Sequence, residues 1–153
     1  MSGIVINGKV AENIKRFVQR DLGCSCTDDV FDHIEMISDP DFNLPDKSKT
    51  LIIGSRLLLT VWMTEDLDGV GPRLSDLMLA GQCMRDKLNL NRFRLIIATD
   101  NPRETCDILR PYLGTLPNTD DRTHLHMVWI TPTIRIIINW EQIDEKRNTP
   151  ENS

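Results

Sequence analysis

Apolar residues recur along the chain with two different spacings, which predict both helices and strands. Residues 9–22 place Val10, Ile14 and Phe17 on one stripe of an amphipathic helix, and Gly23 is suited to end it in a left-handed conformation. Further helices are predicted over 73–88 and from Asn101 onward. Short apolar runs predict strands at residues 4–6, 51–53, 56–63, 93–99, 124–130 and 134–139.

Capping and breaking residues mark where these elements begin and end. Asn101-Pro102-Arg103-Glu104 is a helix start, with asparagine as the cap and proline at the first position, and Pro111 should kink or end that helix. Thr27-Asp28-Asp29 is a second start signature. Residues 30–38 fit either a short continuing helix or a helix that passes into a strand, and residues 39–49 have the composition of a loop.

The order of these elements predicts the fold class. Gly54-Ser55 between two apolar runs indicates a hairpin with a primed two-residue turn. The alternation of strand and helix from 56 to 130 implies right-handed βαβ crossovers and at least three parallel strands. We therefore expect an α/β fold with a mixed sheet of about four to six strands, covered by helices. Residues 1–140 form one domain, and 141–153 form a polar, frayed tail.

Composition and charge narrow the function classes. The 153 residues are 40% hydrophobic and 27% charged, with a net charge of −5, so a nucleic-acid role is disfavoured because phosphate backbones require a clustered basic face. Neither a signal peptide nor an apolar run long enough to cross a bilayer is present in the sequence. These features predict a cytoplasmic protein whose four cysteines are reduced, with any disulfide transient.

Cys24 and Cys26 are the first candidates for chemistry. A thiol beside a helix start is favoured as thiolate, and two sulfurs one residue apart could bind a soft metal or exchange with a disulfide. Nearby aspartates at 21, 28 and 29 disfavour the thiolate, and a direct bridge needs a tight turn at Ser25. The favoured interpretation is that both are half-buried residues at a helix corner, and Cys83 and Cys106 are expected to pack in the core.

His124 and His126 alternate on a predicted strand and therefore project from one face. They could ligate one metal together with Asp120 or Asp121, although a plain hydrophilic strand face is the favoured interpretation. The opposite face is expected to supply core contacts through Leu125, Met127 and Trp129.

Two predicted loops, 64–72 and 100–103, should meet at the carboxyl edge of the parallel strands, where ligands of open α/β sheets bind. Gly69-x-Gly71 resembles part of a phosphate loop but lacks its third glycine and its Lys-Ser/Thr. A solvated loop is the simpler interpretation. The candidate ligand-edge residues are Asp66, Asp68, Gly69, Gly71, Asp100 and Asn101.

Residues 17–31, with Leu22-Gly23-Cys24-Ser25-Cys26 at their centre, resemble a group of uncharacterised prokaryotic proteins that share a leucine-glycine-cysteine-x-cysteine element. Residues 91–99 are similar to the same group. In that group a proline often follows the second cysteine, where this chain has Thr27. The resemblance implies one domain over most of residues 10–130 and implies no activity.

Three functional hypotheses follow. The first is a binding module without complete catalytic machinery and without a cofactor, whose partner is a protein or a small molecule. The second is a thiol-redox or soft-metal-binding protein that uses Cys24 and Cys26. The third is an enzyme that handles a divalent metal or a phosphate at the carboxyl edge, which requires Asp66, Asp68 and Asp100 to converge.

Overall fold

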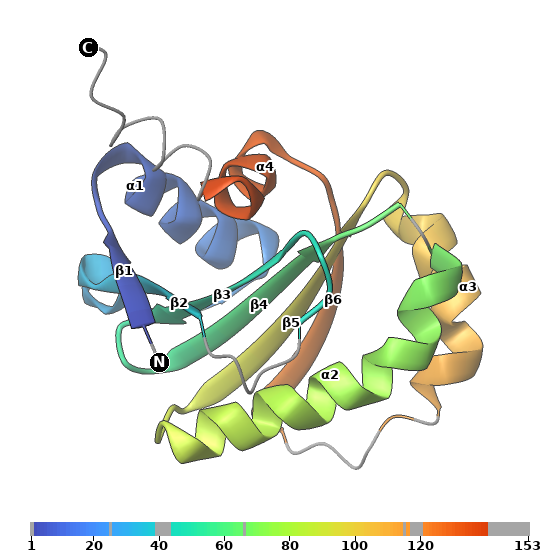
Figure 1. Cartoon of the computed structure of the whole chain (residues 1–153). Helices are drawn as coiled ribbons and strands as arrows, with labels where there is room; N and C mark the ends of the chain where they lie inside the picture. Colours follow the sequence, from blue (N-terminus) through green and yellow to red (C-terminus); the bar gives the residue numbers. More distant parts are fainter. Residues whose placement is uncertain are drawn as a thin grey trace.

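A computed structural model describes residues 2–24, 26–38, 44–65, 67–114, 116 and 121–140. They form a mixed sheet whose strands are neighbours in the order β1 to β6, with helices on both faces (Figure 1). The strands from β1 to β4 are antiparallel, and β4, β5 and β6 are parallel. The strands are β1 (Ser2–Ile6), β2 (Ile34–Ser38), β3 (Ser48–Ile53), β4 (Leu57–Met63), β5 (Arg92–Thr99) and β6 (Thr123–Trp129).

Four α-helices cover the sheet in two layers. Helices α1 and α4 lie over one face, and α2 and α3 lie over the other (Figure 1). Helix α1 continues into a π-helical turn, Phe17–Asp21, and a 3₁₀ helix, Asp28–Asp32, precedes β2. The helices are α1 (Gly8–Arg16), α2 (Leu67–Lys87), α3 (Pro102–Leu113) and α4 (Pro132–Ile138). The predicted α/β class with a mixed sheet is therefore confirmed.

The alternation of side chains along the strands divides the hydrophobic core in two. On β5, Phe93, Leu95 and Ile97 face α2 and α3, whereas Ile96 and Ala98 face α1 and α4. Successive side chains of a strand leave opposite faces, so one buried strand supplies both cores. The position of β5 between the two cores explains why its sequence is a long apolar run.

The predicted hairpin is confirmed, and its turn is tight. Gly54 and Ser55 both have positive φ, and the Arg56 N–H donates to the carbonyl of Ile53 at 3.1 Å. A Cβ at Gly54 would lie 2.2 Å from the carbonyl oxygen of Val30, so a glycine is required there both by conformation and by space. The strand β4 resumes at Leu57 rather than at Arg56, and β3 already begins at Ser48, inside the stretch expected to be loop.

The sequence-based prediction of where α2 begins is wrong by six residues. The helix starts at Leu67, so Gly69, Gly71 and Pro72 lie inside it rather than in a loop. Pro72 has no N–H, so the carbonyl of Asp68 has no helical hydrogen-bond donor. Both residues are exposed, and water can therefore satisfy that carbonyl. Gly71 is buried, and a Cβ there would lie 2.3 Å from the ring of Tyr112 on α3.

Two further predictions differ from the structure. Pro111 is predicted to kink or end α3, and it does not end it, because it is exposed and the carbonyl it deprives of a donor, that of Asp107, belongs to an exposed residue. Residues 134–139 were expected to form a strand, but Pro132–Ile138 is a helix. Its cap is Thr131, whose hydroxyl accepts from the Ile134 N–H at 3.3 Å, and its buried residues 134, 137 and 138 have helical spacing.

Candidate functional site

The described residues among those predicted for the carboxyl edge belong to helix α2 and to the start of α3. Asp68, Gly69 and Gly71 belong to the first turns of α2, and Asp66 lies outside the described residues. Asp100 is exposed, and the Asn101 side chain accepts from the Glu104 N–H at 3.2 Å, so it serves as the cap of α3. No phosphate loop therefore exists between β4 and α2, because the glycines are helical.

A different hollow, of about 350 Å³, does lie at this edge. It follows the ends of β4 and β6, and its charged lining residues are Asp46, Lys47, Glu65 and Arg135, all exposed. Two acids and two bases on an exposed surface favour neither cations nor anions. Ligands of open α/β sheets bind at the carboxyl edge, and this hollow lies there. Its lining side chains, however, do not gather charges of one sign or groups that could act together.

A second hollow, of about 320 Å³, lies at the opposite edge, beside the starts of β4 and β5. We call it the arginine hollow. None of the lining residues that the structure describes is acidic. Its polar and sulfur-bearing lining includes Cys24, Cys26, Arg56, Asn91, Arg92 and Arg94.

The starts of β4 and β5 bring the three arginines together. The Arg56 carbonyl accepts from the N–H groups of Asn91 and Arg92, at 2.7 and 3.0 Å. On β5, Arg92 and Arg94 leave the same face as Ile96, which is the face covered further along by α1 and α4. Three positive side chains therefore gather where that face is not closed by a helix.

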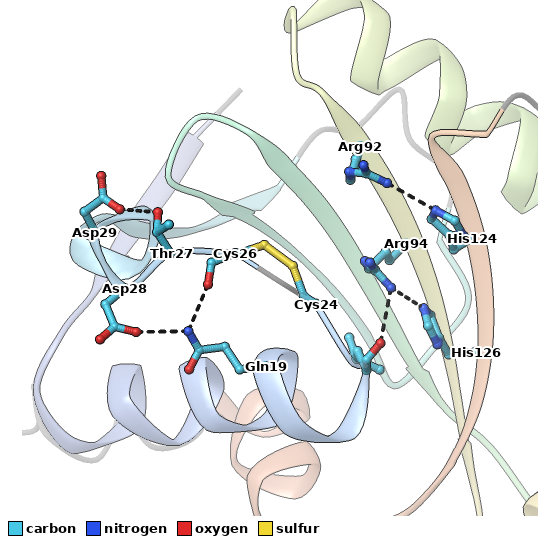
Figure 2. Close-up of a disulfide and its surroundings, with 11 residues drawn as sticks. Gln19, Cys24, Cys26, Thr27, Asp28, Asp29, Arg92, Arg94, His124 and His126 are labelled. Atoms are coloured by element: carbon cyan, nitrogen blue, oxygen red, sulfur yellow. Dashed lines mark hydrogen bonds between the residues drawn. A yellow bond between two sulfur atoms is a disulfide. The ribbon is translucent and has the colours of Figure 1, made fainter.

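The neighbouring strand β6 adds two histidines to this face. Arg94 Nη1 donates to His126 Nε2 at 2.7 Å, and Arg92 Nη1 lies 3.5 Å from His124 Nε2 (Figure 2). A guanidinium has donors only, so His126 Nε2 is the acceptor and the ring is neutral. Burial, then the charge of Arg94 and the nearby His124, lower the pKa of His126 to about 4. Burial and the charges of both arginines also lower the pKa of His124.

Arg94 is the most unusual side chain of the hollow. It is 8% exposed, and its other contact is a long one, 3.5 Å from Nη1 to the Leu22 carbonyl oxygen. Its buried Nε has no hydrogen-bond partner among the residues that the structure describes. Burial and the charge of Arg92 lower the pKa of Arg94, although a guanidinium remains protonated at neutral pH. A buried charge with an unused donor is costly unless something satisfies it.

Cys24 and Cys26 form a disulfide on the wall of the hollow, with their Cα atoms 5.4 Å apart (Figure 2). The sequence analysis expects reduced cysteines with any disulfide transient, and the structure shows this pair in the bridged form. Cys26 is half-buried as expected, whereas Cys24 is buried, at 8% exposed. This separation lies within the range that a direct disulfide allows.

The cysteine segment is held to the end of the first helix. The Cys24 N–H donates to the Val18 carbonyl at 3.1 Å, and Gln19 Nε2 donates to the Cys26 carbonyl at 3.1 Å. The same Gln19 amide donates to Asp28 Oδ1 at 3.1 Å. The disulfide is therefore positioned from both sides by backbone and side-chain contacts.

The aspartates near the pair do not face the hollow. Asp28 pairs with Gln19 and with Lys15, whose Nζ lies 3.4 Å away, and these two contacts lower the pKa of Asp28. Asp29 accepts from the Thr27 hydroxyl, and in Figure 2 both carboxylates lie on the side away from Arg92 and Arg94. Arg56, Arg92 and Arg94 line the same hollow as the disulfide, so positive groups accompany the pair in space, which the sequence did not predict.

The two remaining cysteines do not line the arginine hollow. Cys83 is exposed, which contradicts the core role expected for it, and Cys106 is half-buried. Trp129 is 61% exposed and does not supply the core contact expected from β6, whereas Leu125 and Met127 do. Within the described ranges, no group of three histidine, cysteine or acidic side chains could hold a metal ion.

Sequence reasoning missed Arg56, Arg92 and Arg94. A signal for two of them was present, because arginines at alternate positions of an otherwise apolar strand must share one face of the sheet. Arg56 and the cysteine segment also line the arginine hollow. Their positions depend on the pairing of β4 with β5 and on the path of the chain after α1, which the sequence does not reveal.

Comparisons with known proteins give no match: no family model, no curated protein and no solved structure is significantly similar to this chain. The resemblance to proteins with a leucine-glycine-cysteine-x-cysteine element stays a prediction. None of the helices described by the structure is long and apolar enough to cross a membrane.

Proposed function

We propose that this protein is a binding module for a small anionic ligand, which it holds in the arginine hollow. The observation that carries the proposal is Arg94, which is buried on the wall of the hollow with a free Nε donor. Arg92 and Arg56 add two more guanidinium groups, and no acid among the described lining residues neutralises them. Charge-assisted hydrogen bonds from arginine suit carboxylate and phosphate groups, which accept them in pairs.

The neutral state of His126 supports the same proposal. Its imidazole accepts from Arg94 Nη1 and fixes the guanidinium plane, so the remaining donors are directed rather than mobile. A preorganised donor loses less entropy when a ligand binds. The hypothesis of an enzyme at the carboxyl edge lacks comparable support, because Asp68 belongs to α2 and the described residues hold no metal cluster.

The proposal is tested by titrating the oxidised protein with inorganic phosphate and with citrate, at low ionic strength. Binding is followed by the ¹H–¹⁵N resonance of the Arg94 Nε–H group and by calorimetry. We expect the Arg94 Nε–H resonance to shift on saturation, because the bound anion changes the electrostatic environment of the guanidinium group. Arg92→Gln removes one charged donor without creating a cavity in the core, because Arg92 is exposed. Loss of a charged hydrogen bond costs about 1.5–3 kcal/mol, or about ten- to hundredfold in affinity.

Arg103→Gln is the matched control, because Arg103 is exposed on α3, outside the arginine hollow. It removes the same charge from the protein and should leave the affinity unchanged. Equal losses in Arg92→Gln and Arg103→Gln would mean that net charge, rather than the hollow, attracts the anion. An Arg94 resonance that does not move at saturating anion would contradict the proposal directly.

A further inference from the structure

The disulfide and the arginines line the same hollow, although they come from three separate segments of the chain. An anion held by the guanidinium groups therefore has the Cys24–Cys26 bond as part of its binding wall. This arrangement differs from an anion site that merely neutralises charge. It places a group that exchanges with thiols beside groups that attract negative charge.

We infer that the ligand class of the hollow is an anionic low-molecular-weight thiol, which exchanges with the Cys24–Cys26 disulfide. The inference rests on the proposed anion-binding function and assigns that site its substrate. The carboxylate or sulfonate of the ligand binds the arginines, and its thiolate approaches the disulfide. Both negative groups of such a ligand are favoured by the positive charge of the hollow.

The exchange proceeds in two balanced steps. The ligand thiolate attacks the Sγ atom of Cys26, the more exposed of the two residues, and forms a mixed disulfide while the Cys24–Cys26 bond breaks. The electron pair of that bond stays on Cys24 Sγ, which leaves as a thiolate. A second ligand thiolate then attacks the ligand sulfur of the mixed disulfide, and Cys26 leaves as a thiolate. Two ligand thiols are oxidised to their disulfide, and the protein disulfide is reduced by two electrons.

The surroundings of Cys24 favour its role as the leaving group. A buried thiolate is unfavourable unless a positive charge stabilises it, and Arg92 and Arg94 provide that charge on the wall of the same hollow. The charge of Asp28 is offset by Lys15, whose Nζ lies 3.4 Å away, and the Asp29 carboxylate accepts from the Thr27 hydroxyl. The positive charge of the hollow thus favours both the binding of the ligand thiolate and the departure of the Cys24 thiolate.

The test compares three thiols that differ in charge: 2-mercaptoethanesulfonate, 2-mercaptoethanol and cysteamine. The oxidised protein, verified by a count of two free thiols, is treated with each thiol, and reduction of the Cys24–Cys26 peptide is followed by alkylation and mass spectrometry. Each rate is divided by the rate of the same thiol with a small neutral disulfide, which removes differences in intrinsic reactivity. We expect the anionic thiol to be preferred over the cationic one by about tenfold or more, the lower end of what charged clefts achieve.

The double variant Arg56→Gln/Arg92→Gln should reduce this preference toward one, and Arg103→Gln should leave it unchanged. High salt should weaken the preference of the native protein, because it screens the guanidinium charges. Equal normalised rates for the three thiols would overturn the inference, as would failure of Cys24 and Cys26 to form a disulfide in air. If phosphate still binds in that case, the proposed function stands and only the thiol substrate is wrong. If phosphate does not bind, both fail.

Discussion

Arg94 occupies a position on β5 that an apolar residue fills in most buried strands. Its neighbours along the same face, Ile96 and Ala98, belong to the core between the sheet and α1 with α4. The guanidinium is held by His126 at 2.7 Å and keeps an unused Nε. A polar pair at the edge of an apolar face costs stability, so its presence is more easily explained by binding than by folding.

The neutral state of His126 makes the stability of the fold depend on pH. Its pKa is about 4 in the folded protein and near its usual 6.5 in the unfolded chain, because burial, Arg94 and His124 oppose its charge. The unfolded chain therefore binds a proton first as the pH falls. The stabilisation is complete above about pH 6.5 and is lost progressively between pH 6.5 and 4.

We expect this loss to be on the order of 1 kcal/mol, because the ring is half-buried and solvent screens part of the effect. Urea unfolding at a series of pH values measures it. His126→Gln keeps an acceptor for Arg94 but cannot be protonated, so its stability should depend less steeply on pH in this range. His33→Gln, at an exposed histidine, should retain the native slope. A native slope in His126→Gln would contradict the assignment.

At the scale of elements, two glycines of α2 allow close packing that the helical pattern did not predict. Gly71 lies against Tyr112 of α3, and Gly81 lies against Phe93 of β5. A Cβ at Gly81 would be 2.0 Å from the Phe93 ring, which is fully buried and cannot move aside. The helix therefore approaches the sheet more closely than any larger residue would permit.

Gly81→Ala should destabilise the protein, although alanine is the better helix former by about 1 kcal/mol. The methyl group overlaps Phe93, and overpacking of a core costs about 1–3 kcal/mol. Thermal and urea unfolding measure the net change. Gly114→Ala is the matched control, since Gly114 has φ −73° and no atom within 4 Å of the added Cβ. A stabilised Gly81→Ala would show that the contact with Phe93 is looser than described.

At the scale of the whole molecule, one sheet joins two hydrophobic cores. Neighbouring residues Ile96 and Ile97 are both fully buried, but they face opposite helical layers. Because β5 supplies side chains to both cores, neither core can be lost without disturbing the other. We therefore expect one cooperative unit rather than two layers that unfold separately.

Ile96→Ala and Ile97→Ala should each destabilise the fold by about 2–5 kcal/mol and shift one common transition. Circular dichroism and tryptophan fluorescence during urea unfolding should give coincident curves in both variants. Val5→Ala, at a residue 53% exposed on the edge strand, should change stability by no more than about 0.5 kcal/mol. A variant in which the two signals separate would contradict the single cooperative unit.

The sequence alone determined the alternation of strands and helices, the mixed sheet and its parallel half. Local signals were sufficient there: the apolar runs of β4, β5 and β6, the Gly54-Ser55 turn and the Asn101 cap. Local signals misled where an exposed proline is tolerated in a helix, as at Pro72 and Pro111. They also misled at α4, because a run of isoleucines is compatible with both a strand and a helix. The cap at Thr131 is the feature that favours the helix.

The candidate site was decided only by tertiary structure. From the sequence, Cys24 and Cys26 were candidates for chemistry, but the aspartates near them disfavoured a thiolate. The sequence also predicted that a ligand would bind at the carboxyl edge of the sheet. Strand pairing instead brings Arg56, Arg92 and Arg94 to the disulfide, and Gln19 and Lys15 hold Asp28 aside. Electrostatic interactions depend on distance through space, so charges from distant segments must be counted together with those adjacent in the chain.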